Sequence, residues 1–194
     1  MTDDTILALD IAFANVGYAV RQLNSEALIA AGCVHPAPTP PKTHRHQYVA
    51  DVDFQRCVSW VREVSELVRQ WKPIAIVAEL PSGGAKSATT MKLLGQAAAM
   101  MAAVHYYYPD ALFIPVTPGE VKQAAQVGKR KGKQPVIEAV LVLHPELAGM
   151  GIEKGDLEHA CDATMAMHAA LDDAANAALW RVAGLQRIEE ANEL

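Results

Sequence analysis

Apolar positions along this chain alternate between strand-like and helix-like patterns. The segments 5–23 and 27–34 predict three strands, and the first two are expected to be joined by a tight turn near residues 15–17. Between residues 48 and 71, valines recur at helical spacing. The run 74–78 that follows is apolar without interruption, which is the pattern of a strand covered on both faces.

The second half of the chain predicts further helices and one more strand. Helices are expected over 85–106, 117–126 and 135–144 and from residue 157 onward, with a strand over 111–116. Three leading strands followed by alternating helices and strands predict an α/β fold. We expect a mixed β-sheet, with antiparallel leading strands followed by parallel ones, flanked by helices on both sides.

Two local patterns refine these boundaries. Thr117 has the character of an N-cap, with Pro118 at the first helical position and Glu120 completing a capping box. The segment 35–47 is rich in proline and predicts an exposed connecting loop. Its histidines could suggest a metal site, but the prolines between them prevent a convergent helical spacing, so the loop is the favoured interpretation.

Composition is consistent with one intracellular domain. The chain has 194 residues, 51% of them hydrophobic, and no shift in composition divides it, so we expect a single domain over 1–194. Its cysteines, Cys33, Cys57 and Cys161, are scattered, which argues for a reduced protein and against a zinc or disulfide framework. The N-terminus is acidic, unlike a secretory signal, and the longest apolar helical stretch, 97–104, is too short to span a bilayer.

The segment 74–96 poses a choice between two kinds of site. Its Gly-rich turn followed by Lys-Ser suggests a phosphate-binding loop, but that motif needs glycine at two positions held here by Leu80 and Ala85. The spacing therefore argues against a nucleotide-binding loop. What remains is Glu79, at the end of the apolar strand.

Two carboxylates interrupt or end apolar strands. Asp10 breaks a run that would otherwise be a buried central strand, and Glu79 ends the run 74–78. A carboxylate in such a place loses solvation and needs a cation or several hydrogen-bond donors to stay charged. The alternatives are an aspartate that bonds a turn amide and a glutamate that reaches water.

A late helix adds a histidine and a third carboxylate. His159 and Asp162 are three residues apart and so lie on one face, which continues with small residues suited to packing on a sheet: Ala163, Ala166 and Ala170. Asp156 and Glu158 lie at the start of this helix, where interaction with the helix dipole is the ordinary explanation.

Taken in order, these features resemble the RuvC family of Holliday-junction resolvases, within the RNase H-like superfamily. The resemblance covers most of the chain and rests on Asp10 with the hairpin that follows it, and on the strand ending in Glu79. It rests also on "MKLLGQA" at 91–97, "VKQ" at 121–123, "KQPVIEAV" at 133–140 and "HACDATMAM" at 159–167.

The resemblance implies an RNase H-like nuclease fold with a divalent metal site. It implies that Asp10, Glu79 and Asp162 bind Mg²⁺ or Mn²⁺, as two ions, and that His159 takes the fourth position. Glu158, four residues before Asp162, is a second-tier candidate. The basic positions beside the cleft in this family correspond to Lys122 and Lys133.

Two departures from the family pattern concern the substrate. Family members commonly have Asp-Pro-Gly at the first ligand, whereas this chain has "DIAFAN" at 10–15, which indicates a divergent, phage-type branch. An aromatic wedge often follows the glutamate, but Leu80, Pro81 and Ser82 occupy that segment here. The expected activity is a metal-dependent endonuclease that resolves Holliday junctions, in a bacterial cytoplasm or encoded by a phage and acting in its host's cytoplasm.

Two further surfaces are expected to contact DNA and a second copy. The net charge is −5, so a DNA-binding surface must be local, and the loop 127–134 supplies it with Lys129, Arg130, Lys131 and Lys133. The helix 85–106 is apolar almost all round, which indicates a homodimer, with a larger intramolecular core as the alternative. Its small-residue face comprises Ala88, Met91, Gly95, Ala98 and Ala102.

Alternative activities remain open from the sequence. A nuclease of the same fold acting on flaps, other branched DNA or RNA-containing hybrids would use the same four residues. An actin-like ATPase would need further Gly-rich phosphate loops, which the chain lacks. A non-catalytic DNA-binding module would give Asp10 and Glu79 no reason to be buried near each other.

Overall fold

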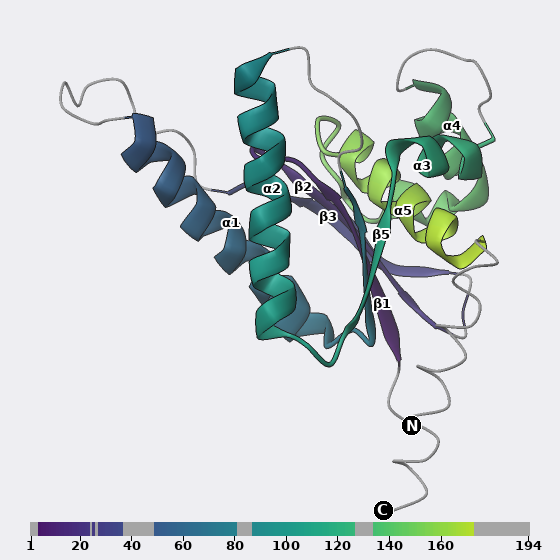
Figure 1. The fold of residues 1–194 in the computed structure, drawn as a ribbon. Coiled ribbons are helices and arrows are strands. Elements are labelled where there is room, and N and C mark those ends of the chain that lie inside the picture. Colours follow the sequence, from purple (N-terminus) through teal and green to yellow (C-terminus); the bar gives the residue numbers. More distant parts are fainter. Residues whose placement is uncertain are drawn as a thin grey trace, which may run out of the picture.

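A single five-stranded sheet organises the molecule (Figure 1). The computed structural model describes residues 4–23, 25, 27–36, 49–80, 87–126 and 134–172. The strand order is β3-β2-β1-β4-β5. The strands are β1 Thr5–Ile11, β2 Val16–Gln22, β3 Leu28–Val34, β4 Ala75–Glu79 and β5 Leu112–Val116.

The sheet is mixed, as the sequence predicts. β1 pairs antiparallel with β2, and β2 with β3, whereas β1 with β4 and β4 with β5 are parallel. β1 is therefore the central strand, and apolar side chains cover both of its faces. Because side chains alternate along a strand, Ile6 and Ala8 pack into one core while Leu7 and Leu9 pack into the other.

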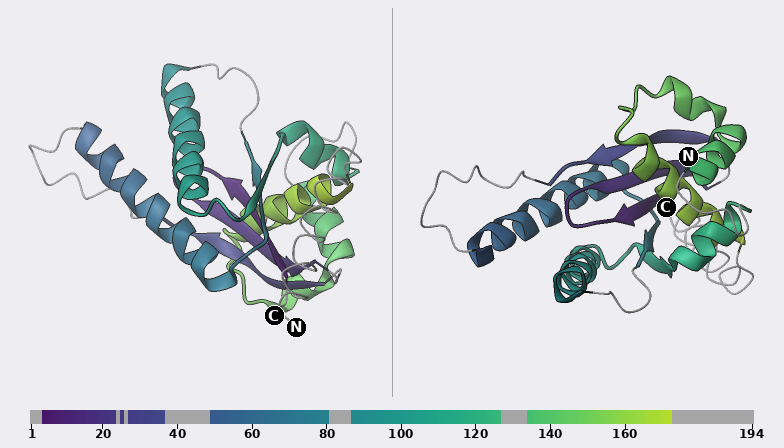
Figure 2. Two further views of the ribbon diagram at one scale, coloured as in Figure 1. Left: turned by 60° about the horizontal axis from the view of Figure 1, so that its bottom comes forward. Right: turned by 90° about the horizontal axis from the view of Figure 1, so that it is seen from above.

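Helices cover the two faces of the sheet (Figures 1 and 2). On one face, α1 Val49–Trp71 and α2 Ala88–Tyr107 pack with Trp60 fully buried among strand residues. On the other face lies α5 Leu157–Asp172, whose Ala163, Ala166 and Ala170 are buried as its small-residue face predicts. α3 Pro118–Ala124 and α4 Gln134–Leu143 pack against α5.

A local sequence signal accounts for the start of α3. The side chain of Thr117 accepts a hydrogen bond from Glu120 N at 3.3 Å, and Glu120 Oε2 accepts one from Thr117 N at 2.6 Å. This confirms the predicted capping box.

A short 3₁₀ helix, Pro145–Gly149, was not predicted, because five residues are too few to display a periodicity. None of the helices in the described residues is long and apolar enough to cross a membrane.

The turn between the first two strands lies a few residues earlier than the sequence predicted. The connection runs over residues 12–15, where Ala12 N donates to Asn15 O at 3.2 Å, and Gly17 lies within β2 opposite Asp10. Glycine at position 17 serves packing and not the turn. A Cβ atom there would lie 2.1 Å from the carbonyl oxygen of His159, so its absence lets α5 approach the sheet.

Candidate active site

Asp10 and Glu79 lie side by side at one edge of the sheet. They are register partners in the parallel pair of β1 and β4, near the carboxyl ends of both strands. Alternation along each strand places Asp10 on the face of Ile6 and Ala8, and Glu79 on the face of Val77, which is the face that α5 covers. The two carboxylates thus meet beneath the same helix.

His159 and Asp162 come to this edge from the first turns of α5. His159 Nδ1 lies 2.8 Å from Asp10 Oδ2, and the two side chains are only 18% and 17% exposed. Asp162 is close enough to Glu79 to repel its negative charge. The structure therefore brings together all four residues that the sequence singled out for the site, from three separate elements.

The electrostatics of this edge are those of crowded carboxylates. Burial, followed by repulsion from Asp10 and from Asp162, raises the pKa of Glu79 to about 7. Lys122, which is exposed on α3, lowers the pKa of Glu79. Three acidic side chains that interact electrostatically, with one lysine nearby, form a region of negative potential that a cation would stabilise.

The donor set fits hard divalent cations. Carboxylate oxygens are the ligands that Mg²⁺ and Mn²⁺ prefer. Among the described residues, no three of these four side chains have ligand atoms that all lie within 4.8 Å of one another. With the side chains in these positions, one ion could not contact three of them at once.

Both ring nitrogens of His159 already have partners. Asn15 Nδ2 lies 3.2 Å from Nε2, so the amide donates and Nε2 accepts. Nδ1 then carries the proton and donates to Asp10. In this arrangement His159 orients Asp10, and its binding of a metal stays a prediction, since a ligand bond would require one of these hydrogen bonds to break.

The predicted DNA-binding residues are only partly described. Lys122 is exposed and near the carboxylates. Lys129, Arg130, Lys131 and Lys133 lie outside the described residues.

Sequence reasoning missed Asn15 and His35. Asn15 looked like a turn residue, yet its side chain links His159 to His35, whose Nδ1 lies 3.0 Å from Asn15 Oδ1. His35 Nε2 in turn lies 3.1 Å from Asp156 Oδ2. Asp156, expected only to interact with the helix dipole, therefore also has a side-chain partner. No spacing could reveal these contacts, because they join distant segments.

Comparison with known proteins identifies the fold. No protein-family model matches the sequence, and no curated protein matches it. Thermus thermophilus RuvC in complex with a Holliday junction substrate superposes with a TM-score of 0.60 at 16% identity, over 84% of this chain and 92% of that one. This chain has the RuvC fold.

Two further solved structures support the same assignment. A second structure of Thermus thermophilus RuvC gives a TM-score of 0.59 at 15% identity, covering 86% of this chain and 95% of that one. The yeast mitochondrial Holliday junction resolvase gives 0.57 at 12% identity, covering 86% and 77%. The RNase H-like α/β fold predicted from the sequence is thus confirmed.

Proposed function

We propose that the protein is a metal-dependent endonuclease that hydrolyses phosphodiester bonds in branched DNA, with the four-way junction as its substrate. The observation that carries this proposal is the register pairing of Asp10 with Glu79 at the edge of a RuvC-like sheet, beneath Asp162 and His159 of α5. Solved structures with a similar fold include RuvC in complex with a Holliday junction substrate and a yeast mitochondrial Holliday junction resolvase, which supports the proposal.

The position of each of the four residues suggests its role in binding metal ions. Asp10, on the rigid central strand, would contact both ions, while Glu79 and Asp162 would each hold one of them. His159 donates to Asp10 and thereby fixes the direction of that carboxylate. Divalent ions, when bound, would lower the pKa of an attacking water and stabilise the leaving 3′-oxygen.

DNA would approach this edge over a basic surface. Lys122 lies on α3 beside the carboxylates, and the sequence continues into Lys129, Arg130, Lys131 and Lys133. Lysine and arginine bind backbone phosphates without reading sequence. In a chain of net charge −5, such a concentrated basic segment favours a local role of this kind.

We place a homodimer interface on the outer face of α2. The buried residues of α2 are Ala97, Met100, Met101 and Val104, so the small-residue face points away from the core of the described chain. Met91 is 50% exposed, and a Cβ atom added at Gly95 would meet nothing within 4 Å. A two-fold pair would present two active sites to two strands of a junction.

One observation favours a second substrate class. Leu80 follows Glu79 directly, and the aromatic wedge common in the family is missing from the segment 80–82. A nuclease without that wedge could act on flaps, other branched DNA or RNA-containing hybrids with the same four site residues.

The deciding experiment compares substrates and a matched variant. Purified protein is incubated with a synthetic four-way junction, a flap, an RNA–DNA hybrid and a linear duplex, with and without Mg²⁺. We expect Mg²⁺-dependent, paired incisions in the junction, and Asp10→Asn should lower the rate by at least about 10³-fold. Junction binding in a gel-shift assay should persist in the variant. Unchanged cleavage by Asp10→Asn would refute the site, and preferred cleavage of a flap or hybrid would favour the second class.

A further inference from the structure

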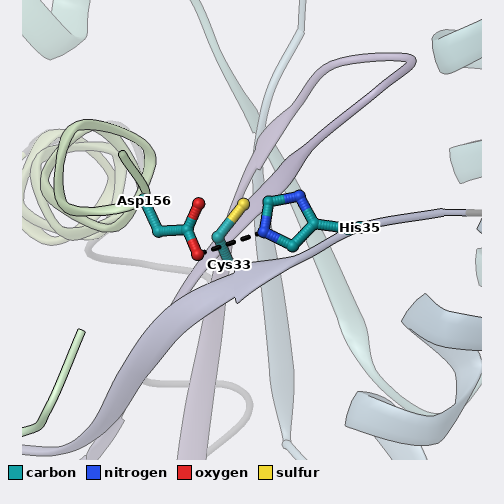
Figure 3. Close-up of side chains that lie close together, drawn as sticks. All are labelled: Cys33, His35 and Asp156. Atoms are coloured by element: carbon teal, nitrogen blue, oxygen red, sulfur yellow. Dashed lines mark hydrogen bonds and ion pairs between the residues drawn. The ribbon is translucent and has the colours of Figure 1, made fainter. Parts of the chain in front are cut away.

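A second group of ligating side chains lies outside the four-residue site. Cys33 Sγ, one ring nitrogen of His35 and a carboxylate oxygen of Asp156 all lie within 4.8 Å of one another. Cys33 is near the end of β3, His35 follows that strand, and Asp156 immediately precedes α5 (Figure 3). All three are partly or fully accessible to solvent, so an ion could reach them.

The hydrogen bonds of His35 fix which nitrogen faces the group. Nδ1 lies 3.0 Å from Asn15 Oδ1, and since that oxygen can only accept, Nδ1 carries a proton. Nε2 faces Asp156 Oδ2 at 3.1 Å. A neutral imidazole would then direct a lone pair at a carboxylate oxygen, so either a second proton or a cation must lie between them.

This pattern is the one that metal-binding histidines commonly show. A histidine that ligates through one nitrogen usually donates the other N–H to a carbonyl or carboxylate, which holds the ring in place. Asn15 Oδ1 is such an acceptor. The amide of Asn15 is itself oriented, because its Nδ2 donates to His159 Nε2.

We propose that Cys33 Sγ, His35 Nε2 and the Asp156 carboxylate bind a Zn²⁺ ion, with a water molecule in the fourth position. Tetrahedral zinc with bonds of about 2.0–2.3 Å needs neighbouring ligand atoms roughly 3.3–3.8 Å apart. The nitrogen and oxygen of His35 and Asp156 are 3.1 Å apart, so a small opening of that pair would accommodate the ion.

The ligand types of this site differ from those of the four-residue site and favour a different metal. Thiolate and imidazole are soft or intermediate ligands that favour zinc over Mg²⁺, whereas the carboxylates of Asp10, Glu79 and Asp162 favour hard ions. Without a cation, burial and then the charge of Asp156 raise the pKa of Cys33 to about 12, so the thiol keeps its proton. Binding of the ion would release that proton to solvent.

Such an ion would join two distant parts of the chain. His35 and Asp156 are 121 residues apart, and the ion would fasten the end of β3 to the beginning of α5. The scattered cysteines, none of them in a Cys-x-x-Cys pair, predicted that the chain has no zinc framework. Cysteine spacing reveals only ligands that are close in sequence, whereas Cys33, His35 and Asp156 are brought together by folding.

Cobalt gives a direct test, because Co²⁺ occupies zinc sites and shows a near-ultraviolet charge-transfer band only when sulfur is a ligand. The 194-residue chain is treated with a chelator and titrated with Co²⁺, and the titration is followed by absorbance. We expect a saturable band at one ion per chain that added Zn²⁺ removes. Excess Mg²⁺ should leave the band in place. The band should vanish in Cys33→Ser and persist in Cys57→Ser, a matched change in α1.

A second variant and a stability measurement complete the test. Asp156→Asn should weaken Zn²⁺ binding by at least about 10-fold, and Zn²⁺ should raise the Tm of the wild type more than that of Cys33→Ser. Circular dichroism checks that each variant folds.

Absence of the band in the wild type would mean that His35 and Asp156 form an ion pair only, and it would overturn the proposal. So would a band retained in Cys33→Ser or removed by Mg²⁺. These readouts involve no DNA cleavage, so they stand or fall independently of the nuclease function.

Discussion

The imidazole of His159 lies 2.8 Å from the carboxylate of Asp10, although 149 residues separate them in the sequence. On the other side of the ring, Asn15 holds Nε2 at 3.2 Å. Asn15 thus fixes the tautomer in which His159 donates to Asp10. Comparable outer hydrogen bonds keep metal-ligand carboxylates and histidines in their working orientation.

Loss of the Asn15 amide should therefore impair cleavage without impairing DNA binding. We expect Asn15→Ala to lower the single-turnover cleavage rate on a four-way junction by about 10- to 100-fold. Junction affinity, measured by gel shift without divalent ions, should be unchanged. A wild-type rate in Asn15→Ala would show that His159 needs no such support.

The raised pKa of Glu79 predicts a pH dependence of stability in metal-free protein. Its pKa is about 7 in the fold, against an ordinary value of 4.5, so the folded state holds the proton more tightly than the unfolded state. In EDTA, Tm should fall as pH rises from about 4.5 to about 7 and then level off. Glu79→Gln should remove most of this decrease. Glu153→Gln, an exposed control, should retain it.

Addition of Mg²⁺ at pH 8 supplies the complementary measurement. The ion would offset the repulsion among the three carboxylates, so the Tm of the wild type should rise more than that of Glu79→Gln. An equal rise in both proteins would place the Mg²⁺ site elsewhere.

Gly17 should tolerate no side chain. A Cβ atom there would lie 2.1 Å from the His159 carbonyl oxygen, which belongs to the backbone and cannot swing aside. Gly17→Ala should lower the free energy of unfolding by about 2 kcal/mol or more, and it should displace α5 and with it His159. Chemical denaturation measures the loss. Gly149→Ala, where a Cβ atom meets nothing within 4 Å, is the matched control and should change stability little.

The outer face of α2 should form the dimer interface. Gly95→Glu adds a charge that cannot be desolvated in a close helix interface, so sedimentation at micromolar concentration should change from dimer to monomer. The monomer should stay folded, because the position is exposed in the single chain. Gly149→Glu, on an exposed position outside α2, should remain dimeric. A monomeric wild type would contradict this interface.

The basic segment should set the salt dependence of DNA binding. Neutralising Lys129, Arg130 and Lys131 together should weaken junction binding and reduce the slope of log K against log salt by about 2 to 3, because each lysine or arginine on a phosphate releases about one counterion. Filter binding between 50 and 200 mM salt, values in the range where such slopes are commonly measured, provides the test. An unchanged slope would mean that these residues remain solvated when DNA binds.

Much of the fold could be predicted from the sequence because its signals are local. The apolar runs of β1 and β4 reflect burial on both faces of the sheet, and the capping box at Thr117 lies within four residues. Asp10 and Glu79 stood out for the same reason, since a carboxylate within or after a buried strand is costly wherever the strand lies.

Tertiary structure alone decided which residues meet. The parallel register that sets Asp10 against Glu79, the role of Gly17 as a contact point for α5, and the chain of hydrogen bonds from Asp156 through His35 and Asn15 depend on strand order and helix placement. These contacts join segments more than a hundred residues apart or on different elements. Periodicity records only whether a residue is buried, and not what buries it, so no pattern in the sequence could have shown them.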